Sequence, residues 1–103
     1  MEKVVSNVAW EGKTGDVVIK EISWKEKTDT IKKAMREIVS GRVLKKEMDP
    51  VLQKNYAILA SIKTAPFPVD LASLEKISAK DGERIFKAYS ELNELSEEEP
   101  QGN

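Results

Sequence analysis

The chain has 103 residues, of which 40% are hydrophobic and 34% are charged, and its formal net charge is −1. This length suits one domain with a modest core, and the nearly neutral charge argues against a general polyanion-binding protein. The chain contains no cysteine and no histidine. Disulfides, thiolate nucleophiles, Cys-ligated metals and the usual general base near neutral pH are therefore excluded. No apolar run is long enough to span a membrane and no signal peptide is visible, so we expect a cytoplasmic protein.

The first predicted element is a β-hairpin over residues 3–22. Two runs rich in valine and isoleucine flank the turn Glu11–Asp16, which contains two glycines. This pattern is typical of two antiparallel strands. Because an isolated hairpin is only marginally stable in water, we expect it to pack on helices or on another subunit.

A first helix is predicted to begin at Ser23, because Ser23 and Glu26 have the spacing of a capping box. Ser40-Gly41 is a plausible end for this helix, and Arg42–Met48 could be a loop or a helical turn. One apolar stripe at helical spacing supports this helix: Ile31, Ala34, Met35, Ile38 and Val39.

Three further helix starts carry capping residues. Asp49-Pro50 starts the most apolar helix, which the prolines of Ala65–Pro68 end. Asp70 caps a short helix, and Ser78 starts a last amphipathic one. The sequence therefore predicts an α+β fold that is mostly helical, with an N-terminal β-hairpin followed by three to four α-helices.

One globular domain is expected over residues 1–95, with the hairpin at 3–22 and the helical part at 24–95. Residues 96–103 are acidic, lack apolar side chains and contain Pro100 and Gly102. This composition is typical of a disordered tail.

No constellation of catalytic residues is visible. The carboxylates fall at helix caps, on polar helix faces or in the tail, and the turn Gly12–Gly15 lacks the upstream glycine of a phosphate-binding loop. We therefore expect no enzyme activity, no cofactor and no metal site.

Aromatic side chains are the best candidates for contact with a protein partner. For each of them, packing in the core is the competing interpretation. The candidates are Trp24, Tyr56, Phe67, Phe86 and Tyr89.

The stretch from Lys32 to Lys46 is basic and could contact phosphate, which makes a small DNA- or RNA-binding regulator an alternative. Acidic residues interrupt the stretch at Glu37, Glu47 and Asp49, and no recognition-helix pattern is visible. Nucleic-acid binding is therefore the weaker interpretation.

Over residues 17–95 the layout resembles that of the small tail assembly chaperones of long-tailed phages and related archaeal viruses or proviruses. A β segment, Val17–Trp24, runs directly into a charged helix. A middle helix ends in Ile58–Pro66. The closing part reads Leu71–Ile77, Asp81-Gly82 and Glu91–Leu95.

The resemblance implies a protein without enzymatic activity that works in the host cytoplasm. Chaperones of this family bind the long helical tape-measure protein, deliver tail-tube subunits to it and tend to form homo-oligomers. Some have a frameshifted longer form. A structural adaptor that stays in a viral assembly is a further alternative.

Overall fold

The computed structural model describes residues 1–94, with the side chains of residues 37–40 and 43 left aside. Within this range there are four helices and five strands, and the strands form two sheets. In chain order they are β1 (Glu2–Trp10), β2 (Lys13–Lys20), α1 (Trp24–Lys33), β3 (Met35–Ser40), β4 (Val43–Met48), α2 (Pro50–Ser61), β5 (Ile62–Thr64), α3 (Leu71–Lys76) and α4 (Ala79–Asn93).

The larger sheet is antiparallel, with the order β1-β2-β5. Strands β1 and β2 form the predicted N-terminal hairpin, in which Trp10 pairs with Lys13. The two turn residues, Glu11 (φ 48°) and Gly12 (φ 80°), both have positive φ. This is the backbone geometry that matches the twist of a tight hairpin.

An irregularity in β1 explains why its hydrophobic residues do not alternate strictly. The register with β2 shifts between Val5 and Val8, and Asn7 in this interval has a φ of 58°. An extra residue at such a bulge changes which face the following side chains reach. Val5 and Val8 are consequently both buried, although three positions separate them.

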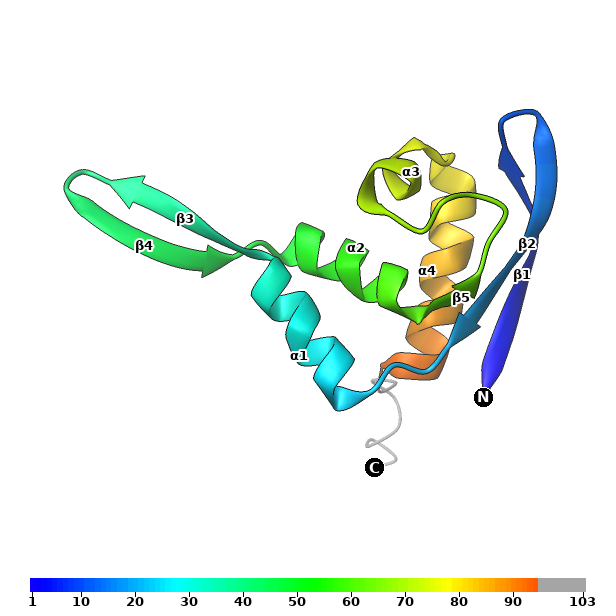
Figure 1. The fold of residues 1–103 in the computed structure, drawn as a ribbon, viewed down its shortest axis with the longest axis horizontal. Coiled ribbons are helices and arrows are strands. Elements are labelled where there is room, and N and C mark those ends of the chain that lie inside the picture. Colours follow the sequence, from blue (N-terminus) through cyan, green and yellow to red (C-terminus); the bar gives the residue numbers. More distant parts are fainter. Residues whose placement is uncertain (95–103) are drawn as a thin grey trace, which may run out of the picture.

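The core lies between the β1-β2-β5 sheet and helices α2 and α4, which lie on the same side of the N-terminal hairpin (Figure 1). Strand β2 supplies Val17 and Ile19, whose alternate positions face this core. The other buried members are Val5, Val8, Ala57, Ile58, Ile62, Phe67, Leu74, Ile85, Ala88 and Tyr89.

Helix α4 is fixed to the sheet at both ends. At its start, the Asp81 carboxylate accepts a hydrogen bond from the Ala9 amide (3.2 Å) and pairs with Arg84 (3.1 Å). Arg84 in turn donates to the carbonyl oxygen of Ser6. These contacts occupy backbone groups of β1 beside its bulge, so side chains of α4 protect part of this edge strand.

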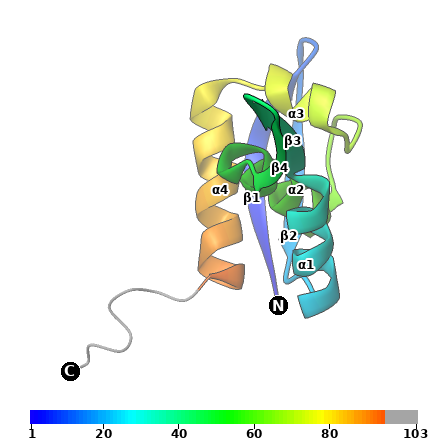
Figure 2. The same ribbon diagram turned by 90° about the vertical axis from the view of Figure 1, so that its left-hand side faces the viewer.

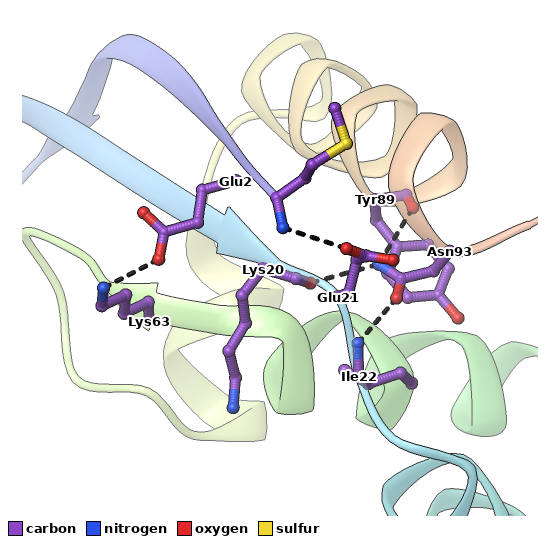
Figure 3. A network of polar contacts seen from close by, with 8 residues as sticks. Glu2, Lys20, Glu21, Ile22, Lys63, Tyr89 and Asn93 are labelled. Atoms are coloured by element: carbon purple, nitrogen blue, oxygen red, sulfur yellow. Dashed lines mark hydrogen bonds and ion pairs between the residues drawn. The ribbon is translucent and has the colours of Figure 1, made fainter.

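At the end of α4, Asn93 is bonded to the segment that joins β2 to α1 (Figure 3). Its Oδ1 atom accepts from the Ile22 amide (2.7 Å), and its Nδ2 atom donates to the carbonyl oxygens of Lys20 and Tyr89 (3.2 Å each). Ion pairs between Glu2 and Lys63 and between the N-terminus and Glu21 lie nearby (Figure 3). The exit of β2, and therefore the start of α1, is thus held against the helix that covers the sheet.

The prediction of a mostly helical fold with one hairpin was wrong. Helix α1 ends at Lys33, and the residues expected to continue it form β3, which pairs with β4 in a second hairpin. The segment Arg42–Met48, expected as a loop or helical turn, is mostly strand. Gly41 has a φ of 63°, as at the first central position of a two-residue hairpin turn, so Ser40-Gly41 starts a turn instead of ending a helix.

The predicted helix starts are confirmed at all four caps. Ser23 and Glu26 form a capping box, Asp49 caps α2 with Pro50 in its first turn, Asp70 caps α3 and Ser78 caps α4. Helix α2 ends at Ser61, earlier than expected, because β5 follows it at once. The tail expected at residues 96–103 lies outside the described residues.

Replacing Gly15 with alanine is expected to destabilise the fold. A Cβ atom at this position of β2 would lie 2.7 Å from Cβ of Pro66, whose ring cannot move away as a flexible chain could. We expect Gly15→Ala to lower the free energy of unfolding by about 1–3 kcal/mol, as overpacking does in other proteins, when measured by urea denaturation. Gly82→Ala on α4 is the control, because a Cβ atom there would have Cδ1 of Ile77 as its nearest neighbour, at an ordinary 3.9 Å. Equal losses in both variants would contradict this explanation.

Asp81 is expected to make stability depend on pH. The Ala9 amide and then the Arg84 guanidinium hold the pKa of the Asp81 carboxyl below its ordinary value. A lowered folded-state pKa stabilises the fold above the unfolded-state pKa, and this contribution disappears as the pH falls through the folded-state pKa. Asp81→Asn should therefore be less stable than the natural chain at pH 7, with a difference that shrinks below about pH 4. Urea denaturation across this pH range measures the difference in the free energy of unfolding between the two proteins. A difference independent of pH would contradict this role of the Asp81 carboxylate.

Candidate interaction surface

Helix α1 contributes no side chain to the buried core cluster. It packs on α2, and its buried positions are Thr30 and, at the C-cap, Ala34. The Thr30 hydroxyl oxygen accepts a hydrogen bond from Nε2 of Gln53 on α2 (3.1 Å). The contact between the two helices is therefore partly polar, and its buried positions are a threonine and an alanine and not the large hydrophobic residues of α1.

Those large residues point to solvent. Trp24 is 77% exposed and Ile31 is 37% exposed. Seven positions are about two helical turns, so the two side chains lie on the same side of α1. Trp24 is held at the first position of the helix by the Ser23–Glu26 capping box, whose reciprocal bonds measure 3.1 and 2.9 Å. The Ser23 amide is also the main cause of the lowered pKa of the Glu26 carboxyl.

Residues 35–48 form a two-stranded arm that projects from the helices (Figure 1). Figure 2 looks at the molecule from the side of the arm, with α4 and α1 on either side of it. The two strands pack mainly on each other and not on the core. Because isolated two-stranded hairpins are marginally stable in water, this arm has little support from its own chain.

The base of the arm is nevertheless well defined. The Asp49 amide donates to the carbonyl oxygen of Ala34 (2.9 Å), which closes the end of the hairpin where it meets both helices. The Asp49 carboxylate caps α2 through the amides of Val51 and Leu52 (3.0 and 3.1 Å) and lies 3.6 Å from the Arg36 guanidinium. The arm thus follows α1 and precedes α2 with only a capping residue at each junction.

Hydrophobic side chains on the arm are exposed as well. Leu44 is 60% exposed and Met48 is 41% exposed, and alternation along β4 places both on the same face as Lys46. Met35, directly opposite Met48 on β3, is also exposed. We define the α1–arm surface by the exposed side chains of Trp24, Ile31, Met35, Leu44 and Met48.

Of the five aromatic candidates for partner contact, Trp24 is the most exposed. Phe67 is 4% exposed in the core, where its ring lies 5.6 Å from that of Trp10. Tyr89 is 3% exposed, and burial raises the pKa of its phenol. The structure therefore places Phe67 and Tyr89 where they support the fold.

The other two candidates, Tyr56 and Phe86, are half-buried beneath lysines. The Lys33 ammonium lies 5.7 Å from the Tyr56 ring centroid, and the Lys54 ammonium lies 4.0 Å from that of Phe86. Phe86 also stacks on Tyr89. The five aromatics come from α1, α2, α4 and the connection before α3, and of the five only Trp24 is mostly in solvent.

Two grooves lie between the helices. One, of about 530 Å³, has Tyr56, Leu59 and Val69 among its lining residues, with acidic residues at its edges. The other, of about 260 Å³, lies where Leu74 and Phe86 approach each other. Both grooves are open and are lined by polar as well as apolar side chains, which suits contact with a polypeptide more than tight enclosure of a small molecule.

The carboxyl groups with a shifted pKa have structural roles. Each of these pKa values is lowered by a lysine partner or a backbone amide, as for Glu91 beside Lys3 and Asp70 at the cap of α3. General acid catalysis near neutral pH needs a raised carboxyl pKa. Within residues 1–94 no group of three or more Asp, Glu, His or Cys side chains is placed to hold a metal ion.

Sequence reasoning missed Leu44 and Met48 as candidate contact residues. Val43 and Leu44 follow Gly41-Arg42, and a short β-favouring run on each side of a Gly-containing pair is a hairpin signal. Gly41 fits a helix end as well as a hairpin turn, and the prediction from the sequence is the helix end.

Comparison with known proteins found no matching family model, no matching curated protein and no matching solved structure. Among the described residues, no helix has the length and hydrophobicity that crossing a membrane requires.

Replacing Trp24 is expected to leave the stability of the fold nearly unchanged, in contrast to Phe67. Trp24→Ala should change the free energy of unfolding by no more than about 0.5 kcal/mol, because the side chain is mostly in solvent. Phe67→Ala should cost about 3–5 kcal/mol, because it leaves a cavity beside Trp10. Urea denaturation of both variants tests this contrast, and a large loss in Trp24→Ala would show that Trp24 supports the fold.

Proposed function

We propose that this chain is a protein-binding assembly factor, acting as a tail assembly chaperone for a tape-measure protein and tail-tube subunits. The α1–arm surface is the observation that carries the proposal. Residues 24–48 expose Trp24, Ile31 and Leu44, and none of the described side chains in this range belongs to the buried core cluster. Exposed tryptophan and aliphatic side chains that do not serve the fold are typical of an interface with another protein.

The layout of the surface suits a long polypeptide client. A helix and a two-stranded arm extend its length (Figure 1). The same elements also carry lysines and acidic residues. Apolar contacts supply affinity for a segment with exposed hydrophobic residues, and the charged surroundings keep the free protein soluble. The resemblance to tail assembly chaperones supplies the identity of the client, self-association and a cytoplasmic location.

The proposal predicts that Trp24 is needed to keep the client soluble. The test is co-expression of the full chain with the tape-measure protein of the same genome, followed by affinity purification. The natural chain should yield a soluble complex, and Trp24→Ala should weaken it by about tenfold or more, as loss of a central interface tryptophan typically does.

Val4→Ala is the matched control. Val4 is also an exposed apolar residue, but it lies on β1 and outside the α1–arm surface. The Val4→Ala variant should leave the complex with the client unchanged. Absence of a complex with the natural chain would reject the chaperone function, and equal losses in the two variants would reject the assigned surface.

A DNA- or RNA-binding regulator is the second candidate, because the basic stretch forms a projecting ribbon and major grooves admit two-stranded β-ribbons. The arm and the end of α1 carry Lys32, Lys33, Arg36, Arg42, Lys45 and Lys46. Binding to duplex DNA that weakens steeply with salt would favour this candidate. The exposed Leu44 and Met48 side chains favour a protein partner instead.

A further inference from the structure

The arm has two outer edges without a neighbouring strand. In the described part of the chain, β3 and β4 form a sheet of only two strands. Each outer edge therefore presents backbone N–H and C=O groups to solvent, which makes it a template for a further strand. In contrast, the β1-β2-β5 sheet has β2 covered on both sides, and side chains of α4 bond to part of β1.

Strand β4 combines this free edge with a distinct side-chain pattern. Leu44, Lys46 and Met48 lie on one face by alternation, and Lys45 and Glu47 lie on the other. All five side chains are exposed. A strand added to β4 would therefore meet a lysine on each face, with Leu44 before the lysine pair and Glu47 and Met48 after it.

Self-pairing of this strand is unfavourable in the registers that oppose its lysines. In antiparallel pairs of β4 strands centred on Lys45, on Lys46 or between them, a lysine lies directly opposite a lysine of the other copy, whereas a pair shifted toward Glu47 avoids this. Like charges directly opposite each other destabilise a strand pair, whereas opposite charges stabilise it. Lysines on an edge strand thus discourage self-pairing and favour an acidic partner.

We propose that β4 is a docking edge for an extended acidic segment of a partner protein, which adds to the arm as a third strand. The pattern of the segment follows from β4. Positions opposite Leu44 and Met48 are apolar, positions opposite Lys45 and Lys46 are Asp or Glu, and the position opposite Glu47 is uncharged. Main-chain hydrogen bonds give affinity, and the alternating side chains give specificity. The inference rests on the proposed protein-binding function and adds the chemistry of the bound segment.

The base of the arm favours this mode of binding. The bond from the Asp49 amide to the Ala34 carbonyl and the pairing of Arg36 with Asp49 fix the start of the ribbon relative to both helices. An edge held in place before binding loses less conformational entropy when a strand is added.

The test uses the full chain and a synthetic peptide with the core Val-Thr-Glu-Glu-Val, which is the predicted pattern for an antiparallel strand. Fluorescence anisotropy measures binding, and amide NMR shifts locate it. We expect saturable binding with shifts in β4. The same peptide with both glutamates changed to lysine should not bind. Methylation of its backbone nitrogens should abolish binding too, because it removes the ladder donors.

Charge reversal on β4 has a matched control on α1. Lys45→Glu with Lys46→Glu should weaken peptide binding by about tenfold or more, because two attractive cross-strand pairs become repulsive. Lys32→Glu with Lys33→Glu changes the net charge by the same amount away from the edge and should have less than about a twofold effect. If the reversed arm does not fold, Lys45→Gln with Lys46→Gln provides the same test with a smaller expected loss.

Several outcomes would overturn the inference. If both charge reversals weaken peptide binding equally, general electrostatics explains the binding. If the methylated peptide binds as well as the unmodified one, strand addition is ruled out. Displacement of the peptide by duplex DNA, with shifts at the same lysines, would assign the edge to nucleic acid. If the client complex still forms after the charges of Lys45 and Lys46 are reversed, β4 is not the docking edge for that client. Loss of that complex in Trp24→Ala but not in the lysine variants would leave the proposed function standing.

Discussion

Asp49 joins three elements on which the α1–arm surface depends. Its amide bonds to Ala34 at the end of α1, its carboxylate caps α2, and the same carboxylate pairs with Arg36 at the start of β3. A single residue therefore ends one hairpin strand, starts a helix and ties both to the preceding helix. Because each junction is only one capping residue long, the direction of the arm follows from the packing of α1 on α2.

The helix starts could be predicted because capping is local chemistry. A serine or aspartate acts on amides two or three residues away, so Ser23, Asp49 and Asp70 show their role in the sequence itself. The end of α1 could not be settled in the same way. The apolar spacing from Ile31 onward fits a helix, β-branched Ile38 and Val39 fit a strand equally well, and Gly41 suits a helix end or a hairpin turn. Pairing with β4 decides between them, and that pairing is not visible in either segment alone.

Which aromatic side chains are buried also could not be predicted from their neighbours in the sequence. Trp10 ends β1 and Trp24 begins α1 shortly after β2, yet one packs against Phe67 and the other faces solvent. The difference arises because the connection after β5 returns to the hairpin turn, where Pro66 meets Gly15 and Phe67 meets Trp10. This long-range contact covers the ring of Trp10. It brings no core residue to Trp24.

The direct pairing of β2 with β5 closes the sheet across a long intervening segment. Residues 21–61 lie between these strands, and among their described side chains the members of the buried core cluster are Ala57 and Ile58 on α2. Local opening of α1 and the arm consequently leaves the sheet and its cover intact, and such sub-global openings have a smaller free energy than global unfolding. A client bound at the arm would therefore stabilise α1 and the arm against local opening without changing the stability of the core.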